Sequence, residues 1–260
     1  MAPKKTIGDC LWIWGHPPGK SWNGVAGLNG WSDVTPAEAM YYFNAYNIFY
    51  IPCGRSINFS TVKEECKDAK RMGLSIESSD SPSSSLEKIM EAAKEYPKID
   101  RVVFDDFFSE TNEANNWTKY TPERLRDIKT AVNNAGLEFW CVYYHMQRGM
   151  DTKAWLEIFD GVSFWFWDEP GREEYEDNCA QFLNATPGQK RMLGCYLWNF
   201  GKEREAAPDM VIYQLNRGAE TLRAGLIEGI ILHTNILGNM GLAAYDEAKR
   251  WTDLRASEYI

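Results

Sequence analysis

The sequence lacks the features that mark redox, nucleotide-binding and membrane-spanning proteins. Its six cysteines include no CxxC pair, and no apolar run approaches the ~20 residues that a membrane-spanning helix needs. Neither GxGxxG nor GxxxxGK(S/T) follows an early strand-like segment, so dinucleotide-binding and P-loop folds gain no support. We therefore expect neither a membrane span nor an organic cofactor.

Basic residues are also scarce relative to acidic ones. The 260 residues include 28 Lys and Arg against 37 Asp and Glu, which gives a formal charge of −9, and the pI is near 5.0. Binding a polyanion requires a basic surface that displaces counterions. This balance argues against a nucleic acid partner.

The cysteines and the first residues leave the cellular compartment open. Cys10, Cys53, Cys141 and Cys195 fall in strand-like apolar runs, where a free thiol behaves as a small apolar side chain. Residues 1–5 have no apolar segment of the kind that a signal peptide carries. A mature secreted or periplasmic protein would begin in the same way, and we favour that location.

Aromatic residues are abundant, at 14% of the chain with 11 Trp and 13 Tyr. Some must build the core. Others would be exposed as flat apolar platforms with a polar tip, which suit the CH-rich faces of sugar rings.

Short apolar runs alternate eight times with longer amphipathic segments. Each run is rich in Ile, Val, Phe, Tyr and Trp, as expected for strands buried on both faces. The predicted strands are residues 10–15, 48–53, 74–77, 101–105, 138–144, 161–167, 192–198 and 229–233.

Helix signals fill the intervals between these runs. Thr35 and Thr121 each precede a proline at a first helical position, and a long helix is expected from Pro208. Capping-box spacing also predicts helix starts at Thr61 and Ser84. Eight strand–helix units in this length favour a closed (β/α)8 TIM barrel, one domain over residues 1–260, over an open doubly wound sheet.

The chemistry of such a barrel collects where the strands end, and polar residues are found there. All three histidines, His16, His145 and His233, follow predicted strands. The substrate-binding candidates at these ends are Trp14, His16, Arg55, Glu77, Tyr144, His145, Trp167, Trp198, Asn199, His233 and Asn235.

The strongest candidate is the adjacent pair Asp105-Asp106 after the fourth strand. Neighbouring carboxylates raise one another's pKa, so one can stay protonated while the other is ionised. Cleavage of a glycosidic bond needs such an acid and a negative group beside the oxocarbenium-like centre. In the alternative, Asp106 caps the following loop and Asp105 pairs with Arg55 or Arg101.

A second acidic pair, Asp168-Glu169, follows the sixth strand. One of these residues could supply the partner carboxylate across the barrel mouth, and the separation would distinguish a retaining from an inverting mechanism. The same residues also fit the start of a helix.

Residues 103–107, Val-Phe-Asp-Asp-Phe, resemble the Asp-Asp segment of retaining β-N-acetylglucosaminidases of the O-GlcNAcase and bacterial hyaluronidase type. Residues 198–200 and 234–235 resemble later segments of the same family. The resemblance implies that Asp105 orients the 2-acetamido group of the substrate, whose carbonyl oxygen is the nucleophile. It implies that Asp106 is the general acid/base.

Another placement resembles retaining α-glycosidase barrels. There Asp105 or Asp106 would attack the anomeric carbon, and Asp168 or Glu169 would protonate the leaving group. Under both interpretations the predicted function is glycoside hydrolysis without a metal ion. The predicted substrate is an oligosaccharide, a polysaccharide or a glycoconjugate.

Two other classes remain as alternatives. One is a non-catalytic carbohydrate-binding barrel that uses the same aromatic residues. The other is a metal-dependent barrel hydrolase or isomerase that uses His16, His145, His233 and Glu77.

Overall fold

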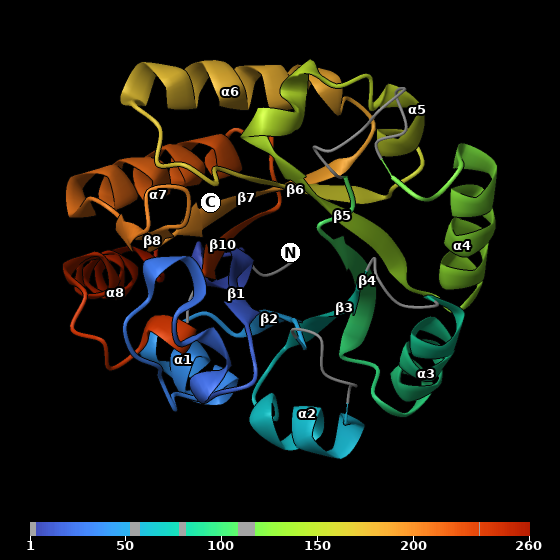
Figure 1. Ribbon diagram of the computed structural model, residues 1–260, viewed down its shortest axis with the longest axis horizontal. Coiled ribbons are helices and arrows are strands. Elements are labelled where there is room, and N and C mark those ends of the chain that lie inside the picture. Colours follow the sequence, from blue (N-terminus) through green and yellow to red (C-terminus); the bar gives the residue numbers. More distant parts are fainter. Residues whose placement is uncertain (1–3, 53–57, 78–81, 109–117, 234) are drawn as a thin grey trace.

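The protein forms a closed parallel barrel of eight strands surrounded by helices (Figure 1). The computed structural model describes residues 4–52, 58–77, 82–108, 118–233 and 235–260. The strand order around the barrel is β1-β10-β7-β6-β5-β4-β3-β2. The predicted (β/α)8 TIM barrel is therefore confirmed.

Eight strands form the barrel, and two short strands form a hairpin beyond β7. The barrel strands are β1 (Leu11–Gly15), β2 (Asn47–Tyr50), β3 (Arg71–Glu77), β4 (Ile99–Asp105), β5 (Glu138–Tyr144), β6 (Gly161–Trp165), β7 (Lys190–Tyr196) and β10 (Gly229–His233). The hairpin strands are β8 (Trp198–Asn199) and β9 (Arg204–Glu205). The helices are α1 (Pro36–Tyr42), α2 (Phe59–Glu65), α3 (Pro82–Glu95), α4 (Pro122–Asn134), α5 (Lys153–Leu156), α6 (Arg172–Ala185), α7 (Pro208–Arg223) and α8 (Ala243–Arg255).

The predicted helix starts are partly confirmed. The Thr35 and Thr121 side chains cap α1 and α4, because each hydroxyl accepts a backbone N–H three residues further on. Thr61 instead lies inside α2, since Asn58 already caps that helix. The start predicted at Ser84 is also wrong, because α3 begins two residues earlier at a proline, which suits a first helical position.

Three predicted strands extend too far. Strand β2 ends at Tyr50, so residues 51 and 52 of the predicted strand lie outside it. Strands β6 and β7 end at Trp165 and Tyr196, two residues before the predicted ends. The aromatic run continues because its side chains pack at the barrel rim after the backbone has left the ladder. Trp198 consequently pairs in the β8–β9 hairpin and not in the barrel.

Large aromatic side chains fill the barrel interior. Trp140 and Trp165 are at most 1% exposed, and glycines in neighbouring strands make room for them. A Cβ on Gly161 would lie 2.2 Å from the Trp140 ring, and one on Gly194 would lie 2.1 Å from the Trp165 ring. The interior is therefore a packed core up to the level of the mouth, as in other barrels of this size.

Arg101 closes the amino-terminal end of this core. Its side chain is fully buried, with the guanidinium carbon 4.4 Å from the Trp12 ring centre and 4.7 Å from that of Trp140. Three carboxylates pair with it at 2.9, 3.4 and 3.5 Å, namely Asp100, Glu138 and Glu228. The ion pairs of Arg101 therefore lie at the opposite end of the barrel from the mouth.

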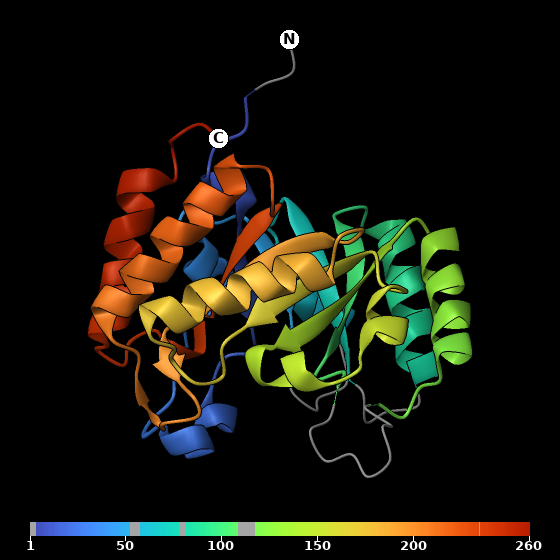
Figure 2. The ribbon, with the colours of Figure 1, turned by 90° about the horizontal axis from the view of Figure 1, so that it is seen from above.

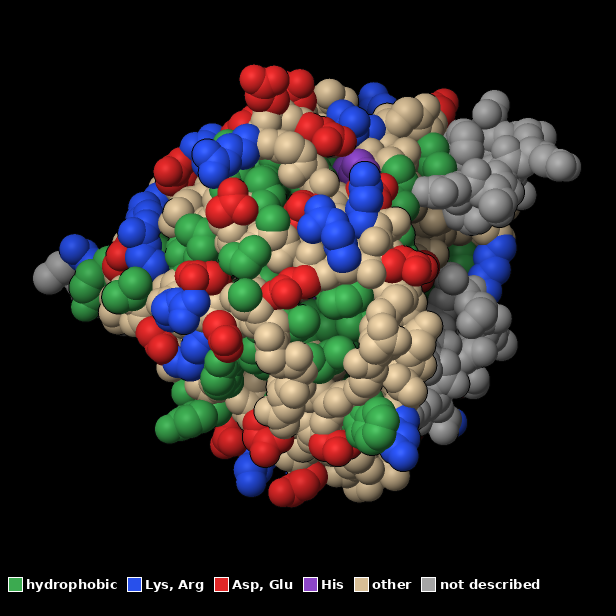
Figure 3. Space-filling model, turned by 60° about the vertical axis from the view of Figure 1, so that its left-hand side comes forward, with side chains coloured by type: hydrophobic (Ala, Val, Ile, Leu, Met, Phe, Trp, Pro, Cys, Tyr) green, Lys and Arg blue, Asp and Glu red, His purple; other side chains and the backbone are tan. Residues whose placement is uncertain are grey.

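The outer surface carries charges of both signs. Acidic and basic side chains are interspersed over the face shown in Figure 3. The five cysteines in the described part of the chain, Cys10, Cys66, Cys141, Cys179 and Cys195, are free thiols. No helix among the described residues combines the length and apolar character that crossing a bilayer requires.

Candidate active site

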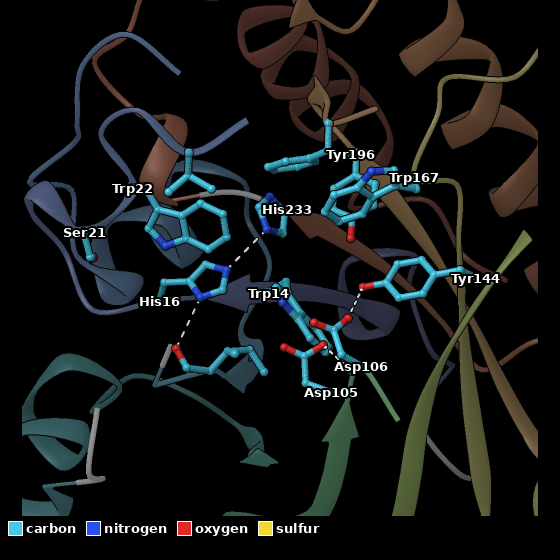
Figure 4. Close-up of a pocket in the computed structure, with 13 residues that line it drawn as sticks. Trp14, His16, Ser21, Trp22, Asp105, Asp106, Tyr144, Trp167, Tyr196 and His233 are labelled. Carbon is cyan, nitrogen blue, oxygen red and sulfur yellow. Dashed lines mark hydrogen bonds between the residues drawn. The ribbon is translucent and has the colours of Figure 1, made fainter. Parts of the chain in front are cut away.

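A cavity of about 410 Å³ opens at the carboxyl ends of the barrel strands (Figure 4). This mouth cavity is lined by Trp14, His16, Ser21, Trp22, Val25, Ile51, Asp105, Asp106, Tyr144, Trp167, Tyr196, Phe200 and His233. Seven of these residues were singled out from the sequence as site residues: Trp14, His16, Asp105, Asp106, Tyr144, Trp167 and His233. Side chains from β1, β4, β5, β7 and β10 meet there.

The two adjacent aspartates both line the cavity. Successive residues of a strand point to opposite faces, so a regular strand would have placed only one of them there. Asp106 has a φ of 46°, a left-handed conformation that Asp tolerates better than most residues. Its backbone N–H donates to Asp105 Oδ1 at 3.1 Å. This turn directly after β4 brings both carboxylates to the same space.

Tyr144 holds one of these carboxylates. Its hydroxyl donates to Asp106 Oδ1 at 2.9 Å (Figure 4). Burial raises the pKa of the Tyr144 hydroxyl well above its usual value, and the nearby charges of Asp106 and Asp105 raise it further. The phenol therefore remains a hydrogen-bond donor over the range in which enzymes work.

Tyr196 is a site residue that the sequence interpretation missed. It ends β7, and its ring packs 4.8 Å from that of Trp165. Burial raises the pKa of the Tyr196 hydroxyl, and the charges of Asp105 and Asp106 add to the effect. A second protonated phenol thus stands within electrostatic reach of both carboxylates.

His16 and His233 form a pair of neutral rings. Their Nε2 atoms are 3.3 Å apart, and His16 Nδ1 lies 3.2 Å from the carbonyl oxygen of Ile51. A carbonyl can only accept, so His16 carries its proton on Nδ1, and His233 Nε2 donates to His16 Nε2. Both histidines contribute ring surface to the cavity while these nitrogens are engaged within the protein. The predicted binding of substrate hydroxyls by these histidines stays a prediction.

Burial accounts for the neutral state of both rings. It lowers the pKa of His16 from 6.5 to about 3 and that of His233 well below 6.5. Below pH 6.5 the unfolded chain gains these two protons and the folded chain does not, so acid destabilises the fold. We expect the free energy of unfolding to fall by about 2 kcal/mol per histidine between pH 7 and pH 5.

Chemical denaturation at the two pH values checks this expectation. The double substitution His16→Gln and His233→Gln should show a smaller loss between pH 7 and pH 5 than the unsubstituted protein, because carboxylate titrations are common to both. An equal loss in the two proteins would contradict the assignment of neutral buried rings.

Aromatic rings form the walls of the cavity. Trp167 packs edge-on against Tyr144 at 5.9 Å and lies 5.3 Å from Phe200. Trp22, on the other side, lies 4.8 Å from the His16 ring and 6.1 Å from Phe200. Flat apolar faces and a pair of acids therefore share one enclosure.

The second acidic pair lies away from the cavity lining. Glu169 forms an ion pair with Arg204 at 3.0 Å and also accepts the backbone N–H of Ala207. Asp168 packs against Gly201, where a Cβ would lie 1.8 Å from Oδ1 of Asp168. These carboxylates tie the segment after β6 to the β8–β9 hairpin. Neither is among the residues that line the mouth cavity.

Three other predicted residues have structural partners. His145 stacks on Phe166 with ring centres 5.5 Å apart. Trp198 Nε1 donates to the carbonyl oxygen of Ala26 at 2.9 Å. Asn199 Oδ1 accepts the backbone N–H of Lys202 at 3.0 Å. None of the three lines the mouth cavity.

Asn235 holds the backbone of the segment after β1 by hydrogen bonds. Its Oδ1 accepts the His16 backbone N–H at 2.9 Å, and its Nδ2 donates to the His16 and Val34 carbonyls at 2.8 and 2.9 Å. Arg55 lies outside the described residues. Glu77 ends β3 as the ladder partner of Asp105, and its side chain is outside the described part.

The alternative of a metal-dependent hydrolase or isomerase would need several side chains placed to bind one metal ion. Among the described residues, no group of three or more His, Cys, Asp or Glu side chains is placed to hold a metal ion. His16 and His233 bond to each other, and His145 stacks elsewhere.

Comparison with solved structures finds the same barrel in enzymes of different classes. The structure is similar to a chitinase from Chromobacterium violaceum, with a TM-score of 0.55 and 11% identity over 95% of this chain and 99% of that one. Catalytic domain 2 of the Group II chitinase of Ostrinia furnacalis gives 0.50 and 9%, over 94% and 97%. The tryptophan synthase complex of Pyrococcus furiosus gives 0.52 and 11%, over 95% and 97%.

Likeness at this level of identity shows the fold alone. The class that these comparisons define is therefore the (β/α)8 barrel. No protein-family model and no curated protein matches the sequence. Neither resemblance drawn from the sequence, to the β-N-acetylglucosaminidases or to the α-glycosidases, is tested by these structures, and both stay predictions.

Proposed function

We propose that this barrel is a glycoside hydrolase that acts through Asp105 and Asp106. The observation that carries the proposal is that both carboxylates line one aromatic-walled cavity at the carboxyl ends of the strands. In a (β/α)8 barrel this end is where active sites are built. Sugar rings need flat apolar surfaces, and glycosidic bond cleavage needs an acid and a negative charge close together.

The arrangement favours a substrate-assisted mechanism. Of the described residues that line the cavity, the carboxylates are Asp105 and Asp106, which are adjacent on one strand end. A protein nucleophile facing an acid across the sugar requires carboxyl groups on two sides. Two neighbours on one side suit a substrate whose own 2-acetamido oxygen attacks the anomeric carbon.

In that mechanism each aspartate has one task. Asp105 accepts the acetamido N–H and stabilises the cationic ring that forms when the acetamido oxygen bonds to C1. Asp106 gives its proton to the departing glycosidic oxygen. It then removes a proton from the water that attacks C1, which breaks the bond from the acetamido oxygen and leaves the sugar with its original anomeric configuration.

Tyr144 is the positioning residue in this account. Its hydrogen bond holds the Asp106 carboxyl group in one orientation. We expect Tyr144→Phe to lower kcat by about 10-fold with little change in KM, because Asp106 is then less precisely placed.

Tyr143→Phe is the matched control for that prediction. Tyr143 is the preceding residue of β5, and its hydroxyl donates to the carbonyl oxygen of Gln147 at 3.1 Å, away from the aspartates. An unchanged kcat in Tyr144→Phe, or the same fall in kcat in both variants, would contradict the positioning role.

A screen of 4-nitrophenyl glycosides tests the proposed function. The panel holds both anomers of glucose, galactose, N-acetylglucosamine and N-acetylgalactosamine, assayed from pH 4 to pH 8. Hydrolysis of a 2-acetamido glycoside in preference to its 2-hydroxy counterpart is the expected result. Sugar binding without hydrolysis at any pH would favour the carbohydrate-binding barrel instead.

A further inference from the structure

Two loops that lie far apart in the sequence join into one wall of the mouth cavity. The first follows β1 and covers residues 16–35. The second is the segment that carries β8 and β9, residues 197–205. In Figure 2 the blue segment after β1 and the orange hairpin project together beyond the barrel, at the end opposite the chain termini. We call the pair the β1–β7 wall.

The first loop is held in a fixed shape by its own backbone. Gly19 and Ser32 pair as an isolated antiparallel bridge, with a hydrogen bond of 2.8 Å between the Gly19 N–H and the Ser32 carbonyl. The Gly24 N–H donates to the Leu28 carbonyl at 2.7 Å. This folded loop contributes Ser21, Trp22 and Val25 to the cavity lining.

The β8–β9 hairpin contacts that loop directly. Trp198 Nε1 donates to the Ala26 carbonyl at 2.9 Å. Gly27 and Glu203 approach so closely that a Cβ on Gly27 would lie 2.7 Å from Cβ of Glu203. Gly27 has a φ of 74°, a left-handed value that glycine adopts without strain. The two loops therefore meet along their backbones.

Ring contacts fill the remaining space at the base of this wall. His233 packs 5.9 Å from Trp22, 5.2 Å from Phe200 and 4.9 Å from Tyr196. The cavity is thus bounded continuously from β1 through β10 to β7. Asp105 and Asp106 lie at the carboxyl end of β4, across the barrel from this wall (Figure 4).

We propose that the wall makes the site specific for a single sugar at the non-reducing end of a chain, an inference that rests on the proposed function. With the scissile oxygen at Asp106, the ring that is cleaved off lies between the aspartates and the wall. Trp22 and Phe200 then occupy the space that a further sugar on its non-reducing side would need. The leaving group extends away from the wall.

Aryl glycosides of one and two sugars test this inference. The probes are the 4-nitrophenyl monosaccharide that the enzyme hydrolyses in the panel and the 4-nitrophenyl disaccharide of the same sugar. Direct release of nitrophenol from the disaccharide requires room for a second ring beyond the wall. We expect its initial rate to be lower than that of the monosaccharide by about 100-fold.

Trp22→Ala should open the wall and raise the relative rate of the disaccharide by about 10-fold. Trp31→Ala is the control, because Trp31 lies on the same loop and does not line the cavity. Its side chain is 41% exposed, and Lys20 Nζ lies 4.5 Å from its ring centre. Equal rates for the two probes in the unsubstituted protein would overturn the inference and leave the proposed function standing. No release from any glycoside of the panel would overturn both.

Discussion

Replacing Asp106 by Asn is expected to reduce kcat for the preferred glycoside by about 1000-fold, because the variant can no longer give a proton to the leaving oxygen. Asn tolerates the left-handed backbone that Asp106 adopts at φ 46°. Its amide oxygen can still accept the hydrogen bond from Tyr144. The substitution therefore removes the acid with little other change, and kcat should fall without a comparable rise in KM.

The control for this variant is Asp177→Asn, a chemically identical change at an exposed position of α6. It should leave both kcat and the melting temperature unchanged. If Asp106→Asn keeps more than a tenth of the original kcat across pH 4 to pH 8, Asp106 is not the general acid. A large drop in its melting temperature would instead trace the loss to folding.

Arg101→Leu is expected to lower the free energy of unfolding by about 3 kcal/mol, the low end of the range for breaking a buried ion pair. The substitution leaves three carboxylates without their common cation and removes the guanidinium stacked between Trp12 and Trp140. For a chain of this size the melting temperature should fall by roughly 6–12 °C. Differential scanning calorimetry or chemical denaturation measures the change.

Arg126→Leu serves as the comparison. Its side chain is 58% exposed and pairs with Glu123 one helical turn earlier at 3.6 Å. Exposed pairs of this kind contribute little, so the free energy of unfolding should change by less than about 0.5 kcal/mol. Equal effects of the two substitutions would show that Arg101 and its ion pairs at the amino-terminal end of the barrel do not stabilise the fold.

The barrel was predictable because its strands are buried on both faces. Continuous apolar runs separated by capped helices leave few alternatives, and Thr35 and Thr121 cap helices as their sequence context predicts. Strand ends were harder to place. Aromatic residues pack equally well inside the ladder and on the rim, so the runs to Trp167 and Trp198 continue past the last paired residues.

Part of the site follows from strand alternation. On β1 the inward positions are Trp12 and Trp14, and the next inward position is His16. On β7, Met192 points into the barrel interior, so every second residue after it should also point inward. The second of these positions is Tyr196. That signal was available in the sequence and would have found the missed tyrosine.

Other features of the site depend on geometry that alternation does not contain. By strand alternation from β4, the Asp106 side chain would point outward from the barrel. It reaches the cavity only because its φ is positive. Glu169 also follows a barrel strand, four residues after the end of β6 at Trp165. It is nevertheless drawn to Arg204 by a hairpin whose position depends on the tertiary fold. Proximity to a strand end therefore identifies candidates without deciding which of them face the cavity.

The central claim is that neighbouring aspartates at the mouth of this barrel cleave a glycosidic bond with the substrate's own acetamido group. Proton NMR of the reaction with the preferred 2-acetamido glycoside tests it most directly, by identifying the anomer released before mutarotation. The account predicts that the first product has the same anomeric configuration as the substrate. A first product of inverted configuration would contradict it.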